Sequence, residues 1–162
     1  MKPDHDYIGN LIGIILIMSS GIGAQGSQSG QMMKLPESQA MVASAYDFND
    51  TVELLTVAIE EQNLMVIKEI NAQQMLKMVN MQVQGMKQLL FFHPRYMKKI
   101  VQANPMGAIE PPLKIAVMER PDGKVVVKYI KPSYLLGKYE GLGAIGDELD
   151  EILAAIAAAV KK

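Results

Sequence analysis

The sequence predicts an α+β fold, a two-layer domain with helices packed on a mainly antiparallel sheet, preceded by one N-terminal helix of transmembrane length. Apolar residues recur at helical spacing in some segments and form short β-branched runs in others. Two such runs flank Arg120-Pro-Asp-Gly123, a turn sequence that indicates a hairpin. Residues 7–24 contain no charged side chain, which separates them from the rest of the chain.

The N-terminal segment is predicted to anchor the chain in a membrane over residues 1–24. As a helix, residues 7–24 would extend about 27 Å, close to the roughly 30 Å of a bilayer core. A buried soluble helix fits less well, because the run has no polar face. The apolar centre of the predicted anchor consists of Leu11, Ile12, Ile14, Ile15, Leu16 and Ile17.

A signal peptide cleaved after Ala24 is the alternative, and it would make the protein secreted. It fits less well because Lys2 is offset by Asp4 and Asp6, whereas a signal peptide begins with a basic region. The next cation is Lys34, so the positive-inside rule predicts a cytoplasmic N-terminus and an extracytoplasmic (periplasmic or extracellular) domain. Residues 25–39 are rich in Gly, Ser and Gln and are predicted to be a flexible linker.

The predicted domain comprises residues 40–162. Its first half begins with a strand over residues 41–46. Asn49 or Asp50 is expected to cap a helix that buries Val52, Leu55 and Ile59, and Asn63 is expected to end it in a left-handed conformation. A second strand is predicted over residues 64–70. Asn71 should then cap a short helix that reaches Met78.

The second half is predicted to contain three strands and two helices. A strand over 86–92 precedes a helix over 95–103, which Pro94 introduces and Asn104-Pro105 ends. Strands over 113–119 and 124–130 form the hairpin, which Pro132-Ser133 should end. After a glycine-rich bend, a last helix over 147–160 is expected to place four acidic residues in its first turn, where they would complement the helix dipole.

Composition excludes several functional classes. The 162 residues include no Cys, which removes disulfides, thiolate metal sites and cysteine nucleophiles. A net charge of -1 argues against a nucleic-acid partner, which requires a basic face. The sequence Gly141-Leu-Gly-Ala-Ile-Gly146 matches the dinucleotide fingerprint but lacks its strand context, so no nucleotide and no other cofactor is predicted. These glycines are expected to form a bend and a close-packing site.

Several short motifs, in this order and spacing, resemble the family called domain of unknown function 302. They are Phe48-Asn-Asp-Thr-Val52, Phe92-His-Pro94, Pro111-Pro-Leu-Lys-Ile115, Asp122-Gly123 and Tyr129-Ile-Lys-Pro132. The resemblance covers residues 46–162 and implies a small α+β domain with no activity established for the class. Many members carry Cys where this chain has His93 and Leu113, so a thiol-based role is not expected here. Members with N-terminal signals or anchors also occur.

Met75, Met78 and Met81 form a run with three-residue spacing. Thioethers suit monovalent copper, so a Cu(I) site that also includes Met86 or His93 is one interpretation. The preferred interpretation is core packing, because flexible Met side chains fill irregular gaps. No catalytic residue and no metal site is therefore predicted.

A second candidate site is the junction between the third strand and the following helix. His93 lies there, and Arg95 and Tyr96 in the same turn could help it to bind an anion or another partner. The preferred interpretation is that His93 makes a structural hydrogen bond, because no carboxylate partner for it is evident.

Together these features predict a non-catalytic, membrane-anchored accessory subunit of a larger membrane complex. A respiratory or electron-transfer complex would be a natural setting. The alternative is an extracytoplasmic small-ligand or Cu(I)-binding module that uses His93 and the Met cluster. The expected partners are the membrane and other subunits of such a complex.

Overall fold

The structure is a computed structural model that describes residues 35–161. The predicted anchor over residues 1–24 and most of the predicted linker lie outside the described residues. Within residues 35–161, no helix has the length and apolar character needed to cross a membrane.

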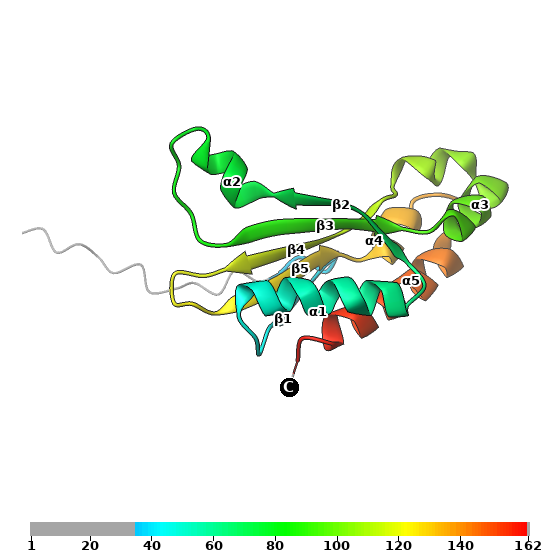
Figure 1. The fold of residues 1–162 in the computed structure, drawn as a ribbon. Coiled ribbons are helices and arrows are strands. Elements are labelled where there is room, and N and C mark those ends of the chain that lie inside the picture. The colour runs from blue at the N-terminus through cyan, green and yellow to red at the C-terminus, as the bar shows by residue number, and fades with distance from the viewer. Residues whose placement is uncertain (1–34, 162) are drawn as a thin grey trace, which may run out of the picture. The chain divides into compact units, whose positions relative to one another are not determined.

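The described residues form an α+β domain with one five-stranded antiparallel sheet, which confirms the predicted fold class (Figure 1). The strand order is β1-β5-β4-β3-β2. In chain order the elements are β1 (Gln39–Ala43), α1 (Phe48–Glu61), β2 (Met65–Asn71), α2 (Ala72–Lys77), β3 (Met86–Phe92), α3 (Pro94–Ala103), η1 (Pro105–Ile109), β4 (Leu113–Glu119), β5 (Val125–Ile130), α4 (Pro132–Leu136) and α5 (Gly143–Ala158).

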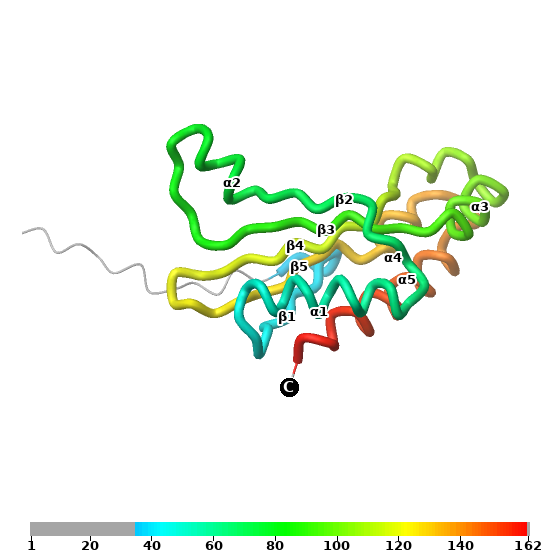
Figure 2. The backbone as a smooth tube through the Cα atoms, viewed as in Figure 1, coloured from blue at the N-terminus to red at the C-terminus, as the bar shows by residue number. Residues whose placement is uncertain are grey.

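The helices α1 and α5 lie against one face of the sheet, which we call the inner face (Figures 1 and 2). Successive side chains of a strand point to opposite faces of the sheet. Those on the inner face are buried because the two helices cover that face. The most deeply buried strand residues are Leu89, Phe91, Ile115, Val117 and Val127. They meet Leu55 and Ile59 of α1 and Leu149, Leu153 and Ile156 of α5 in one core.

Local signals in the sequence placed most helix ends correctly. Asn63 has a φ of 57°, as expected for the residue that ends α1. The Asn71 side chain accepts a hydrogen bond from the Gln74 amide and caps α2. The predicted cap of α1 was wrong: Asp47, rather than Asn49 or Asp50, accepts from the Asp50 amide at 2.9 Å. The helix therefore starts at Phe48, two or three residues earlier than the predicted cap indicated.

The first strand also differs from its prediction, because it ends at Ala43 rather than at residue 46. The Ser44 hydroxyl oxygen lies 2.7 Å from Thr51 Oγ1 and accepts the Tyr46 amide at 3.1 Å. These bonds form a turn that leads into α1, and they compete with continuation of the strand.

The last helix begins at Gly143, four residues before its predicted start. The acidic side chains from Asp147 onward therefore lie beyond its first turn, and the predicted complement to the helix dipole at that end was wrong. The predicted glycine roles are confirmed. Gly141 has a φ of +80°, and a Cβ at Gly146 would lie 2.7 Å from the Ser133 Cα. That close approach packs α5 against α4, a helix absent from the sequence prediction.

Candidate functional site

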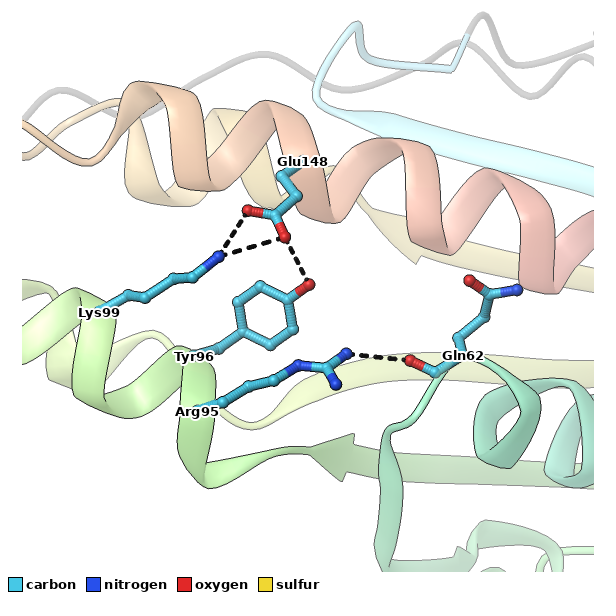
Figure 3. Close-up of polar contacts among 5 residues, drawn as sticks. All are labelled: Gln62, Arg95, Tyr96, Lys99 and Glu148. Carbon is cyan, nitrogen blue, oxygen red and sulfur yellow. Dashed lines mark hydrogen bonds and ion pairs between the residues drawn. The ribbon is translucent and has the colours of Figure 1, made fainter.

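The start of α3 carries the predicted contact residues His93, Arg95 and Tyr96. Arg95 and Tyr96 are drawn with their partners in Figure 3. His93 Nδ1 accepts the Arg95 amide at 3.0 Å and so caps the helix, while Pro94 occupies its first position. The Arg95 guanidinium donates to the Gln62 carbonyl oxygen at 3.2 Å and lies 5.0 Å from the centre of the Tyr96 ring. The structural interpretation of His93 is therefore confirmed.

The Tyr96 side chain joins α3 to α5 through Glu148 (Figure 3). Its hydroxyl donates to Glu148 Oε1 at 2.8 Å, and Lys99 Nζ lies 2.9 Å from Glu148 Oε2. Lys99 Nζ also lies 5.0 Å from the centre of the Tyr96 ring. Because Arg95, Tyr96 and Lys99 all bind protein groups, this arrangement holds α3 against α5 and against the end of α1.

Electrostatics agree with this structural role. Hydrogen bonds, first from Lys99 and then from Tyr96, lower the pKa of Glu148 below its ordinary value. Burial, followed by the hydrogen bond to Glu148, raises the pKa of Tyr96. At neutral pH the pair is therefore a neutral phenol that donates to a charged carboxylate.

Replacing Glu148 with Gln should lower the thermal unfolding midpoint at pH 7 and leave the protein folded. A carboxyl group whose pKa is lower in the folded state stabilises above its unfolded pKa, and this contribution is lost as pH falls through its folded pKa. The Glu148 side chain is 44% exposed, so we expect its charge to contribute less than about 1 kcal/mol to the free energy of unfolding. The difference in unfolding midpoint between the variant and the wild type should vanish in acid.

Glu151→Gln, on an exposed position of the same helix, is the control. A difference that persists unchanged in acid would show that the ion pair is not its source.

The methionine run is exposed, so its interpretation as core packing was wrong. Met75, Met78 and Met81 are 59%, 81% and 53% exposed, and α2 has no buried residue. The structure does not bring His93 to them. Asn71, just before α2, pairs with Lys87 near the start of β3, whereas His93 follows the end of that strand. At 3.4 Å per residue, Lys87 and His93 are roughly 20 Å apart. A copper site that combines His93 with all three methionines is therefore not formed.

The face of the sheet opposite α1 and α5, which we call the outer face, presents another candidate site. Cross-strand pairing places its side chains in rows. Unlike the buried inner-face residues next to them in sequence, they are partly or fully exposed. Three rows contain Ala43, Val126, Met118 and Met86; then Met41, Lys128, Ala116, Gln88 and Ile70; then Lys68, Leu90 and Lys114.

The outer face is apolar and carries only positive charge. Its three ionisable side chains are Lys68, Lys114 and Lys128, and these rows contain no Asp or Glu. Within residues 35–161 the covering helices of the central strands lie on the inner face alone (Figure 1). Lys68 and Lys114 flank Leu90 in the third row, and Lys128 lies between Met41 and Ala116 in the second. An exposed apolar patch of this kind is typical of an interaction surface.

Sequence reasoning missed the outer face, although a signal for it was present. In β4 and β5 the residues between the buried positions read Lys114, Ala116, Met118 and Val126, Lys128, Ile130. A solvated sheet face normally reads as consistently polar at these alternate positions. The mixture of apolar residues with lysine therefore indicated a face that is neither core nor ordinary surface.

Comparisons with known proteins support the family resemblance. The profile of "Domain of unknown function DUF302" matches residues 40–161. No curated protein matches the chain. A crystal structure of the uncharacterized conserved protein DUF302 from Bacillus stearothermophilus is similar, with a TM-score of 0.72 and 19% identity. The match covers 77% of this chain and 99% of that one, and at this identity it supports the fold alone. Since the family profile matches most of its length, the chain belongs to the DUF302 family.

Proposed function

We propose that this protein is a non-catalytic accessory subunit, anchored in a membrane by residues 1–24, whose outer face binds another subunit of a membrane complex. The outer face is the single observation that carries this proposal. Its apolar rows extend across all five strands, and they contribute little to the core, which lies on the other side of the sheet. The uncharged run in residues 7–24 supports the membrane attachment.

Charge indicates the chemistry of the partner. If two copies of the chain paired through this face, the interface would contain Lys68, Lys114 and Lys128 of both copies. Like charges brought together in an interface are unfavourable. A partner that offers apolar side chains and carboxylates would satisfy both features of the outer face. The expected partner is therefore a different subunit, with acidic residues around an apolar patch.

Purification of the full chain from its native membranes in mild detergent tests this proposal. We expect one or more membrane subunits to co-purify in a fixed ratio. The intact mass should include residues 1–24. A chain that begins at Gln25 would contradict the anchor, and a monomer without partner subunits would contradict the accessory role.

A Cu(I)-binding module is the second candidate, and the exposure of three thioethers favours it. Among residues 35–161, no group of three His, Cys, Asp or Glu side chains is placed to hold a metal ion, so such a site would depend on sulfur. Stoichiometric copper in the same purified protein, lost when Met75, Met78 and Met81 are replaced by Leu, would support this candidate. Protein that binds no added Cu(I) would eliminate it.

A further inference from the structure

The connection between β2 and β3 lies at the end of the sheet that also carries the β4–β5 turn (Figures 1 and 2). We call residues 72–85, which contain α2, the tip. The side chain of Gln73 donates to the Val83 carbonyl oxygen at 3.1 Å and ties the two sides of the tip together. The Met81 amide donates to the Leu76 carbonyl oxygen at 3.0 Å, with Asn80 at a φ of 61°. The tip is therefore a formed structure that ends in a tight turn.

The tip exposes four large apolar side chains within seven residues. Met75, Met78, Val79 and Met81 are 59%, 81%, 70% and 53% exposed. These side chains make no part of the core. Exposing large apolar side chains to water is unfavourable. Four of them within one short segment therefore indicate a surface that a partner or a membrane covers.

The charge of the tip is positive. Lys77 is its one ionisable residue, and the remaining polar side chains are Gln and Asn. The chain contains no Asp or Glu between Glu69 and Glu110. At its base the tip meets one carboxylate from another strand, since the Gly85 amide donates to Glu119 Oε2 at 3.2 Å. Around Lys77, apolar side chains next to a lysine are the combination that favours an interface with anionic lipid.

We infer that the tip inserts its apolar side chains into the interfacial region of the membrane to which the chain is anchored. This inference rests on the anchor in the proposed function and adds a second membrane contact to it. It explains the exposure of Val79, which could not ligate copper. It also leaves the outer face free to bind a neighbouring subunit.

The length of the predicted linker permits this second contact. The chain enters β1 at Gln39, which pairs with Ile130, and this end of the sheet is opposite to the tip. The longest strands have seven residues, or about 24 Å. Residues 35–39 already belong to the folded domain, and the Gln39 amide donates to the Pro36 carbonyl oxygen at 2.9 Å. The ten residues 25–34 could span at most about 35 Å if fully extended, which exceeds the strand length, so the anchor and the tip can reach the same membrane surface.

A fluorescent label at Val79 tests the inference in the full chain. Because the protein has no Cys, Val79→Cys provides a unique site for an environment-sensitive nitrobenzoxadiazole dye. The protein is reconstituted into phosphatidylcholine vesicles with and without phosphatidylglycerol. We expect the emission to shift to shorter wavelength on reconstitution, more strongly with phosphatidylglycerol. Nitroxide lipids should quench it at a depth of about 5–10 Å below the headgroups.

Val101→Cys is the matched control. Val101 is 45% exposed on α3, near the other end of the sheet, and its label should keep a water-like emission. A blue shift at position 101 but not at 79 would overturn the inference and place the opposite end at the membrane. Water-like emission at position 79, in protein that floats with the vesicles, would overturn it while leaving the anchor intact. Protein that does not float would contradict both the proposed anchor and the inference, because neither segment would then bind the vesicles.

Discussion

Replacing Leu89 with alanine is expected to lower the free energy of unfolding by about 2–5 kcal/mol, the range for a fully buried leucine. Leu89 has no exposed surface and packs in the core between the sheet and the helices. Truncation removes buried apolar contacts and leaves a cavity that the surrounding strands cannot readily close. Urea denaturation, followed by circular dichroism, measures the change.

The same substitution at Leu90 is the control, because the neighbouring residue on β3 points to the outer face. It pairs with Lys68 and Lys114 and is partly exposed, so its truncation should cost only about 1 kcal/mol. Equal losses at the two positions would mean that the outer face is as tightly packed as the inner one. The face would then be unavailable to a partner.

Replacing Val126 with aspartate is expected to abolish co-purification of the partner subunit and to leave the domain folded. Val126 lies on the outer face between Ala43 and Met118, on neighbouring strands. In the complex a buried, unpaired carboxylate at this position would lose its hydration and would lie close to the acidic groups expected on the partner. Loss of several kcal/mol of binding energy is typical of an unpaired buried charge, and each 1.4 kcal/mol is a tenfold change in affinity.

Val57→Asp provides the matched control for that variant. The substitution makes the same change in charge and size as at Val126. Val57 is 48% exposed on α1 and lies away from the outer face. It should retain the partner at the wild-type ratio. If both variants retain the partner, the outer face is not the binding surface. If both lose it, the effect is one of net charge or stability.

Much of the fold was predictable because strong local signals agreed with tertiary packing. The hairpin was marked by its turn residues, and β4 occupies the predicted residues 113–119. The start of α5 was misplaced because Gly143 and Gly146 are poor helix formers. At Gly146 the absence of a Cβ, which allows contact with Ser133, outweighs that preference. No pattern confined to residues 143–146 could show this, since Ser133 lies outside them.

The candidate sites were less predictable, for two different physical reasons. The environment of Tyr96 depends on Glu148, which lies 52 residues away in sequence and meets it only through the packing of α3 on α5. Exposure of the methionines was missed because periodic Met residues on a helix normally face a core. Here α2 follows the end of β2 and has no buried residue, so its methionines do not enter the core.

The measurement that tests the central claim most directly is photocross-linking from the outer face in native membranes. A benzophenone amino acid replaces Ala116 at the centre of the outer face in the full chain, and Ala154 on the exposed side of α5 in a control. The account predicts one defined cross-link from position 116 to a different membrane subunit, and none to that subunit from 154. A cross-link between two copies of this chain at position 116, or no cross-link at all, would contradict it.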